Sequence, residues 1–422
     1  MPTAPLGPTD LPCGQNCLDG CPIQGKMTKL QAGLVPATND PAVPVVRAFL
    51  DGYAQLTERS EEARRLYPTT VALPALFDLV LSAKYAARAI ANAGWTYCDG
   101  DDYGDRPAKY FPFLKACPRC TVKRDFRPAA KSNKPPSDTI GTIASDVTSL
   151  ILAEYLARVA PGLRVAKTTQ LRGDADAVIY GEALLALAEI KSSPLVIYPL
   201  EIQLPERLTE PRDGEAASMA DHSSITDDLT GPLAFYLPHW DARIPLGPRD
   251  ASWPYATLAR FVADPGIVEI VLAAWRDLYE IYAGNRSARG VSERRRWLMC
   301  GCGSPVDDGK NLPGLDRTDD MKKGTYQVLK YGTSYKEQCL KRVIRAVLIS
   351  NVFPLRLYDA YLADMQDVIW SKDKYIVSSD NDVMSFNKAD VFNLYDALLC
   401  LSDSRYRDEQ LRAVFALPDR SE

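Results

Sequence analysis

Histidine is nearly absent from this chain, which has two among its 422 residues, His222 and His239. Neither lies in a motif typical of serine hydrolases or His-rich metalloenzymes, so we do not expect chemistry that depends on an imidazole. A GxxxxGK[ST] phosphate loop and a GxGxxG turn after a strand are also missing, which argues against nucleotide-driven motors and dinucleotide enzymes. Carboxylates and lysine are therefore the groups expected to carry any catalysis.

Long apolar runs are missing as well. No stretch approaches the roughly 18 uninterrupted apolar residues of a membrane helix, and the N-terminus lacks the charged and apolar regions of a signal peptide. With 46% hydrophobic and 25% charged residues, the composition predicts a cytoplasmic protein without a membrane partner. The net charge of -4 neither indicates nor excludes a polyanionic partner, because local clusters of charge decide docking.

Ten cysteines are present, several of them in close pairs, and in a chain of this length they favour reduced thiols or a metal site over disulfides. Cys117 and Cys120 form a C-x-x-C turn, which presents two thiolates to one tetrahedral ion. Cys300 and Cys302 offer the other half of a structural Zn²⁺ site, and Cys98 is an alternative ligand. A pair of free thiols in a loop is the plainer interpretation.

Basic and aromatic residues surround the C-x-x-C turn between residues 95 and 137, and a second basic run precedes the second cysteine pair. Such segments are typical of surfaces that contact nucleic acid phosphates, with aromatic rings to stack or wedge. A solvated basic loop is the alternative. The predicted DNA contacts are Lys123, Arg124, Arg127, Arg294, Arg295 and Arg296.

The pattern with the clearest chemistry ends at Lys191. Two short apolar runs, AVIY and ALLALA, are bounded by glycines, which predicts two neighbouring strands. Because side chains alternate across a strand, Glu189 and Lys191 share one face. An antiparallel pairing of the two runs brings Asp176 to the same end. Two carboxylates and one ammonium would then converge, which suits a divalent cation and a phosphate.

A helix and a strand precede these two runs. Residues 142 to 162 have an amphipathic helical pattern, and LRVAKTTQL alternates as a strand. Glu154 falls on or beside the apolar face of the helix, where a carboxylate is costly unless it is paired or binds metal. A salt bridge to Arg158 at the border of that face is the open alternative.

This order of helix, strand, strand beginning with Asp and strand ending in Glu-x-Lys resembles the PD-(D/E)XK nuclease superfamily, to which type II restriction endonucleases belong. The resemblance covers about residues 139 to 203. It implies that Asp176 and Glu189 bind Mg²⁺, that Lys191 is the motif lysine, and that Glu154 is the helical Glu that many members place near the metal. Ala175 stands where the family often has Pro.

A competing assignment lies on the next apolar run, Glu201-Ile-Gln203, because some members of the family replace the lysine by Gln. We prefer Glu189 because Lys191 supplies a positive charge and because the hairpin with Asp176 is compact. In the preferred assignment, Mg²⁺ held by Asp176 and Glu189 would activate water and polarise the phosphate. Lys191 would orient or help deprotonate that water and stabilise the transition state.

The sequence therefore predicts an α/β fold with a restriction-endonuclease-like mixed sheet core flanked by helices, and with helical and zinc-stabilised additions. The predicted regions are an irregular N-terminal arm containing Cys13, Cys17 and Cys21 (1–45), a helical accessory region with the basic segment (46–137), the nuclease core (138–350) and a C-terminal helical region (351–422). Metal binding by the N-terminal cysteines is left open.

The predicted function is Mg²⁺-dependent, sequence-specific cleavage of double-stranded DNA by a restriction-type endonuclease. The resemblance implies a homodimer, because restriction enzymes of this family commonly match palindromic sites. A repair or mobile-element nuclease with the same core is one alternative. A non-catalytic, zinc-containing DNA-binding protein, whose carboxylates merely end strands, is the alternative from a different class.

Overall fold

A computed structural model describes most of the chain: residues 24–92, 95–98, 108–112, 137–169, 175–181, 184–198, 200–202, 233–237, 242–284, 312–336, 343–371, 375–377, 383–386, 391–407, 409–415 and 417. The chain divides into two compact units, each assembled from separate stretches. Unit 1 comprises Met1–Asp40, Thr148–Ser193 and Pro313–Glu422, and unit 2 comprises Pro41–Val147 and Pro194–Leu312. The predicted division at residues 45, 137 and 350 stays a prediction.

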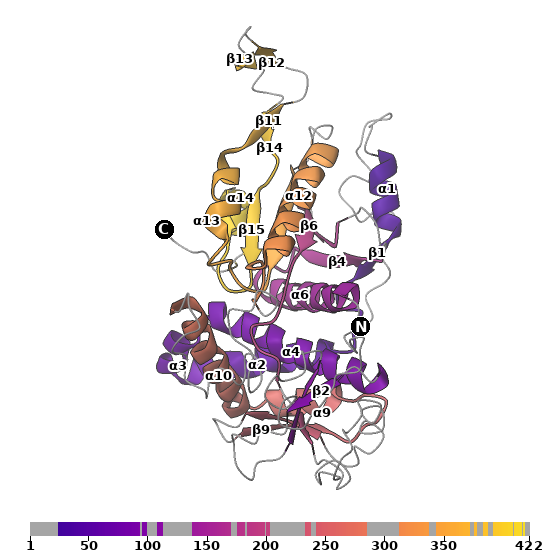
Figure 1. Ribbon diagram of the computed structural model, residues 1–422, viewed down its shortest axis with the longest axis vertical. Coiled ribbons are helices and arrows are strands. Elements are labelled where there is room, and N and C mark those ends of the chain that lie inside the picture. Colours follow the sequence, from indigo (N-terminus) through magenta and orange to yellow (C-terminus); the bar gives the residue numbers. More distant parts are fainter. Residues whose placement is uncertain are drawn as a thin grey trace, which may run out of the picture. The chain divides into compact units, whose positions relative to one another are not determined.

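A mixed sheet of seven strands forms the centre of unit 1 (Figure 1). Its spatial order is β1 (Leu34–Pro36), β4 (Arg164–Thr168), β5 (Ala177–Tyr180), β6 (Leu184–Ile190), β10 (Val343–Ser350), β15 (Ala397–Cys400) and β16 (Arg405–Tyr406). Strands β6, β10 and β15 are parallel, and the other neighbours pair antiparallel. Strands β5 and β6 are buried along their whole length, which explains their nearly continuous apolar sequence.

Helices complete unit 1. Helix α12 (Thr318–Tyr335) packs Val328 and Tyr331 into the same core cluster as Leu185 and Leu187 of β6, and α1 (Gln24–Ala32) adds Leu30 to that cluster. Helix α6 (Ser137–Val159) begins in unit 2, and its residues from Thr148 onward belong to unit 1. The predicted α/β class, with a mixed sheet flanked by helices, is confirmed.

The C-terminal part of unit 1 differs from the predicted helical region. Its sequence forms a short strand, β14 (Val391–Asn393), then β15, an interior strand of the seven-stranded sheet, and then helix α14 (Glu409–Phe415). The prediction of helices is therefore wrong for the run Ala397–Cys400, because an apolar run of this length suits a buried strand as well as a helix. Pairing with β10, which periodicity does not encode, decides between the two.

Smaller elements decorate this region. They are α13 (Tyr358–Tyr361), the 3₁₀ turn η4 (Asp364–Asp367), β11 (Ile369–Ser371), which pairs with β14, and the hairpin of β12 (Tyr375–Val377) with β13 (Val383–Phe386).

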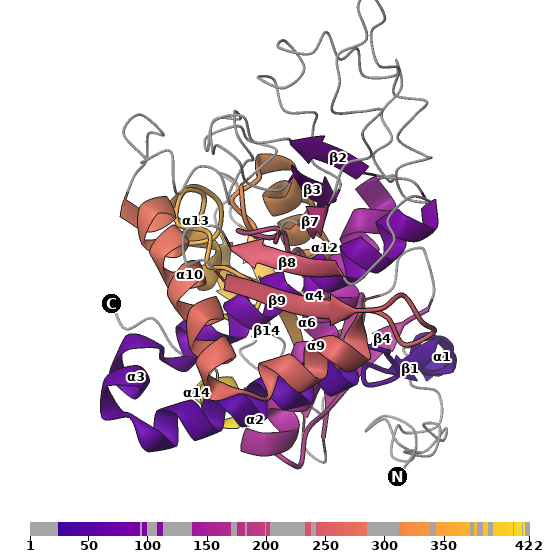
Figure 2. The same cartoon turned by 90° about the horizontal axis from the view of Figure 1, so that it is seen from below.

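Unit 2 combines an antiparallel sheet with a group of helices (Figure 2). The sheet has the order β2 (Trp95–Cys98), β3 (Ala108–Pro112), β7 (Leu200–Ile202), β8 (Leu233–Leu237) and β9 (Ala242–Gly247). The helices are α2 (Val43–Arg59), α3 (Glu61–Leu66), α4 (Thr69–Asn92), α9 (Tyr255–Val262) and α10 (Pro265–Gly284). Asp264 Oδ1 accepts a hydrogen bond of 2.9 Å from Gly266 N where α10 begins, as expected of a residue that caps a helix.

Within the described ranges, one segment is long and apolar enough to cross a membrane, Thr69–Arg88 of α4. The unit buries 83% of its apolar window, as expected for a core helix. Its buried Asp78 accepts hydrogen bonds from Trp275 Nε1 at 2.8 Å and from Val196 N at 3.0 Å. These bonds tie α4 to α10 and to the chain segment that precedes β7.

Candidate active site

A β-hairpin brings the predicted acidic residues together. Strands β5 and β6 pair antiparallel with Ala177 opposite Ala188, so that Asp176 lies beside the end of β6 that carries Glu189. The backbone of Asp176 is fixed by a hydrogen bond of 2.9 Å from its N to Ala188 O. Lys191 N donates to Ile349 O of β10 at 2.8 Å. The predicted hairpin is confirmed, and the sheet holds the backbone of both ends in place.

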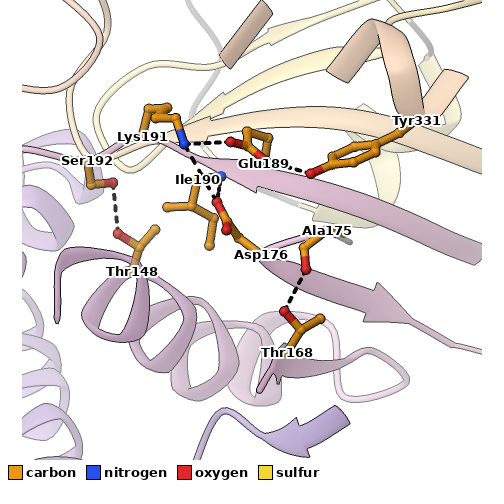
Figure 3. A network of polar contacts seen from close by, with 9 residues as sticks. All are labelled: Thr148, Thr168, Ala175, Asp176, Glu189, Ile190, Lys191, Ser192 and Tyr331. Atoms are coloured by element: carbon orange, nitrogen blue, oxygen red, sulfur yellow. Dashed lines mark hydrogen bonds and ion pairs between the residues drawn. The ribbon is translucent and has the colours of Figure 1, made fainter. Parts of the chain in front are cut away.

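The three side chains meet at this end of the hairpin (Figure 3). Lys191 Nζ lies 2.5 Å from Glu189 Oε1 and 4.0 Å from Asp176 Oδ2. Asp176 Oδ2 also accepts a hydrogen bond of 2.9 Å from Ile190 N. One ammonium therefore bridges two carboxylates, and a backbone N–H fixes the orientation of one of them. The predicted convergence is confirmed, whereas the roles of these residues stay a prediction.

Tyr331 is a fourth member of the group, which the sequence did not indicate. Its hydroxyl donates a hydrogen bond of 2.6 Å to Glu189 Oε2, across 142 positions of the chain. The two oxygens of Glu189 thus receive one donor each, Lys191 and Tyr331. Tyr331 lies in the apolar stripe of α12 with Val328 and Tyr335. The sequence offered one clue to Tyr331, because a tyrosine on an inward helix face needs a hydrogen-bond partner for its hydroxyl.

Electrostatics make this group receptive to a cation. Burial and the neighbouring charge of Glu189 raise the pKa of Asp176 from 3.8 to about 6, although Lys191 and the N–H of Ile190 oppose the shift. Burial disfavours the charged form of Lys191, but the carboxylates of Glu189 and Asp176 outweigh it and raise the pKa of this lysine. Lys191 therefore carries its proton at neutral pH.

Asp176 and Glu189 have the chemistry needed to hold Mg²⁺. The Asp176 side chain is 36% exposed, so solvent and solutes reach a carboxylate whose neighbour repels its negative charge. Mg²⁺ is usually bound by one or two carboxylates, with waters and phosphate oxygens as its other ligands. Across the described ranges, no group of three or more His, Cys, Asp and Glu side chains is placed to hold a metal ion.

Glu154 lies on α6, in the part of that helix that belongs to unit 1, and is 5% exposed. Its neighbours on the predicted apolar stripe, Leu150 and Ile151, are buried as expected, whereas Val159 at the end of the helix is 44% exposed. The predicted position of Glu154 on or beside the buried face of the helix is confirmed. Its membership of the metal site stays a prediction.

The competing Glu201 lies elsewhere in the fold. It belongs to β7, which pairs with β3 and β8 in the sheet of unit 2, while Asp176 and Glu189 belong to the sheet of unit 1. Gln203 lies outside the described residues. The hairpin contact with Asp176 thus favours Glu189 and Lys191 for the candidate site.

The predicted zinc ligands and DNA contacts fall outside the described residues. These are Cys117, Cys120, Cys300 and Cys302 for zinc, Lys123, Arg124, Arg127, Arg294, Arg295 and Arg296 for DNA, and the N-terminal Cys13, Cys17 and Cys21. Cys98 lies in β2, of which the backbone is described. No zinc site is shown within the described ranges.

Comparisons with known proteins give no relative from which a function could be transferred. No family model, curated protein or solved structure matches the chain. The geometry of the residues around Asp176 is therefore the basis for assigning a function.

Proposed function

We propose that this protein is a Mg²⁺-dependent deoxyribonuclease with a PD-(D/E)XK core. Its active site, which hydrolyses phosphodiester bonds, would be formed by Asp176, Glu189 and Lys191. The observation that carries the proposal is the bridge from Lys191 Nζ to both carboxylates at one end of the β5–β6 hairpin. The order α6, β4, β5, β6, α12 and β10, with the unit 2 elements β7 to α10 inserted between β6 and α12, gives further support. In it, the helix with Glu154 precedes the three antiparallel strands, and α12 packs on the sheet after them.

Each residue of the site would have a different role in phosphodiester hydrolysis. Asp176 and Glu189 would hold Mg²⁺, which when bound polarises the phosphate and lowers the pKa of the attacking water. Lys191 keeps its charge at neutral pH, so it is suited to stabilise the negative charge that develops on the phosphate and to orient the water. Tyr331 donates a hydrogen bond to Glu189 and would act through that carboxylate, so it is a positioning residue.

The finer proposal is a restriction-type endonuclease that cleaves double-stranded DNA at a specific sequence, as a homodimer. Support comes from the size of the chain outside the core, because unit 2 spans 226 residues, 107 in Pro41–Val147 and 119 in Pro194–Leu312. A catalytic core alone would need far less chain, whereas target recognition requires additional surface. The homodimer follows from the resemblance to enzymes that match palindromic sites.

The decisive experiment incubates the purified protein with phage and plasmid DNA in Mg²⁺ and in EDTA. Wild-type protein should produce discrete fragments in Mg²⁺ and none in EDTA. Asp176→Asn, Glu189→Gln and Lys191→Met should each lower the cleavage rate at least about 100-fold, because each removes a charge from the reacting centre. Asp359→Asn, which changes an exposed carboxylate on α13, is the matched control and should cleave normally.

The pattern of cleavage separates the candidate functions. A smear of fragments that depends on Asp176 and Lys191 would retain the nuclease and reject sequence specificity. Intact DNA with retained binding would reject catalysis and favour the non-catalytic DNA-binding protein. Cleavage that persists in Lys191→Met and Asp176→Asn would place the active site elsewhere in the chain.

A further inference from the structure

Helix α12 has two sides with different surroundings. Its inner side covers the candidate site: Tyr331 contacts Glu189, and a Cβ added at Gly324 would lie 3.2 Å from Lys191 Cγ. An α-helix with its side chains is about 10 Å across, so the outer side is about one helix diameter from the reacting groups. A substrate that reaches the site would therefore pass close to the side chains on the outer side of α12.

The outer side of α12, defined by Lys322, Lys323, Tyr326 and Lys330, combines cations with an exposed ring. Residues three and four apart align on a helix, so these four side chains lie along one strip. Lys322 and Lys323 are exposed, Lys330 is half-buried, and Tyr326 is 65% exposed. Over the described residues, none of the three lysines forms an ion pair.

By contrast, the lysine at the end of α12 has a structural role in this unit. Lys336, which follows the helix, is buried and pairs with Asp396 of the segment before β15. Its ammonium also donates to Asn393 O at 2.5 Å. Among the described residues the lysines of the outer side have no such anchors, so the described contacts of unit 1 do not account for their clustering.

Helix α1 brings two further lysines, one of which contacts the end of α12. Lys26 Nζ donates to Ser334 O of α12 at 3.3 Å and lies 5.8 Å from the ring centroid of Tyr335. Lys29, one turn further along α1, is exposed. Asp319 is the exposed carboxylate on the outer side of α12, in its first turn, and it offsets part of this charge. The combined strip still carries an excess of cations in a protein whose net charge is -4.

We propose that this strip, formed by the outer side of α12 with Lys26 and Lys29 of α1, binds the phosphate backbone of the DNA strand that enters the site. Unpaired lysines along a helix attract a polyanion and release its counterions. The ring of Tyr326 packs against a deoxyribose or an unstacked base between the bound phosphates. The inference rests on the proposed function, because that function makes a nucleic acid the substrate.

The test measures binding apart from cleavage, so that the two proposals fail separately. Fluorescence anisotropy in EDTA follows a labelled 30-base-pair duplex and the corresponding single strand over a series of salt concentrations. The double variant Lys322→Gln/Lys330→Gln should weaken binding to both DNAs and reduce the slope of log Kd against log salt. For the duplex, each lost phosphate contact should lower the slope by roughly 0.9.

Arg164→Gln/Arg412→Gln removes two exposed cations from β4 and α14 and serves as the matched control. It should leave the slope close to the wild-type value. Tyr326→Ala should weaken single-strand binding roughly fivefold or more if a base stacks on the ring. A loss confined to the duplex would instead assign the ring to deoxyribose. All of these positions are exposed or half-buried, so each variant should keep the wild-type circular dichroism spectrum and melting temperature.

Three outcomes would overturn the proposal. The first is that the wild-type protein binds neither the duplex nor the single strand, whether in EDTA or in Ca²⁺. The second is that the lysine variant and its arginine control lose the same amount of affinity. A poly-glutamate peptide of equal charge could also bind as tightly as DNA and depend on the same lysines, which would indicate an acidic protein partner. DNA binding that needs the strip in a protein without cleavage activity would support this inference and reject the proposed function.

Discussion

At the scale of single residues, the candidate site depends on how the carboxylate of Glu189 is held. Each of its oxygens has one donor, Lys191 Nζ at 2.5 Å and the Tyr331 hydroxyl at 2.6 Å. With its side chain 7% exposed, Glu189 has little access to water that could replace a lost donor. Its orientation, and with it the direction in which it presents lone pairs to a cation, is therefore set by these two neighbours.

Replacement of Tyr331 by Phe should weaken metal binding more than folding. The substitution removes the hydroxyl that donates to Glu189 Oε2. Removal of a hydrogen-bond partner of a metal ligand typically lowers metal affinity roughly 10-fold to 100-fold. The Mg²⁺ concentration for half-maximal cleavage should rise accordingly, and calorimetric titration with Mn²⁺ should show the same shift. The unfolding free energy should fall by about 1 to 3 kcal/mol, because Oε2 remains buried without a donor.

Tyr198→Phe is the matched control for this substitution. Tyr198 is also buried, in unit 2, and its hydroxyl has no hydrogen-bond partner among the described residues. The control should leave the Mg²⁺ dependence unchanged. An unchanged Mg²⁺ dependence in Tyr331→Phe would show that Tyr331 has a purely structural role.

Asp316 should give the protein a measurable pH dependence. Burial raises its pKa from 3.8 to about 6, and hydrogen bonds from Arg356 N at 2.9 Å and Leu357 N at 3.2 Å oppose the shift only in part. Between pH 4 and 6 the folded carboxyl keeps a proton that the unfolded one loses, so the unfolding free energy falls as the pH rises. The full effect, reached above pH 6, is on the order of 3 kcal/mol.

Asp316→Asn should remove this contribution, because an amide oxygen accepts the same two N–H groups without titrating. Urea denaturation at pH 4.5, 6 and 7.5 would measure it, with exposed Asp359→Asn as the control. Parallel stability curves for the wild type and Asp316→Asn would contradict the assignment.

At the scale of elements, glycines set how closely α12 approaches its neighbours. A Cβ at Gly324 would lie 2.9 Å from Leu348 Cδ1 and 3.2 Å from Lys191 Cγ, which are flexible side-chain atoms. At Gly332, two turns further on, a Cβ would lie 2.4 Å from Leu394 O, a backbone atom that cannot rotate away. The same substitution should therefore act on the candidate site at Gly324 and on folding at Gly332.

Gly324→Ala should keep most of the stability and lose activity. The gain of up to about 1 kcal/mol in helix propensity offsets the crowding of Leu348. Lys191 must shift by a few tenths of an ångström, and small displacements of a catalytic group are costly, so the cleavage rate should fall about 10-fold or more. Thermal denaturation and initial cleavage rates would measure the two effects.

Two further glycine variants calibrate this result. Gly141→Ala in α6, where a Cβ meets nothing within 4 Å, should change neither rate nor fold. Gly332→Ala should destabilise the protein by about 1 to 3 kcal/mol or more. Equal cleavage by Gly324→Ala and the wild type would show that Lys191 tolerates the closer helix.

At the scale of the whole molecule, all the residues proposed for catalysis belong to unit 1, although its chain is interrupted twice by unit 2. Asp176, Glu189 and Lys191 come from one stretch, and Tyr331 returns after the segment Pro194–Leu312. A cation that binds at this site stabilises the folded state, because the unfolded chain does not hold the two carboxylates together.

Mg²⁺ should therefore raise the melting temperature of the wild-type protein, and EDTA should reverse the increase. At a Mg²⁺ concentration of 100 times Kd the stabilisation is about 2.7 kcal/mol. Asp176→Asn and Glu189→Gln should lose the response, whereas Asp359→Asn should keep it. Scanning calorimetry measures the change in melting temperature independently of cleavage. An equal Mg²⁺ effect in Asp176→Asn would show that the metal binds at another site.

The sequence by itself determined the β5–β6 hairpin and the meeting of Asp176, Glu189 and Lys191, because strand alternation and a short turn act over neighbouring residues. The tertiary structure alone decided the rest. Tyr331 reaches Glu189 because α12 packs against β6 and β10, and β15 is a strand because β10 and β16 pair with it. Glu201 belongs to the sheet of unit 2, whereas Asp176 and Glu189 pair within unit 1. Local patterns fix how an element presents its side chains, whereas the partner of each element depends on packing between distant segments.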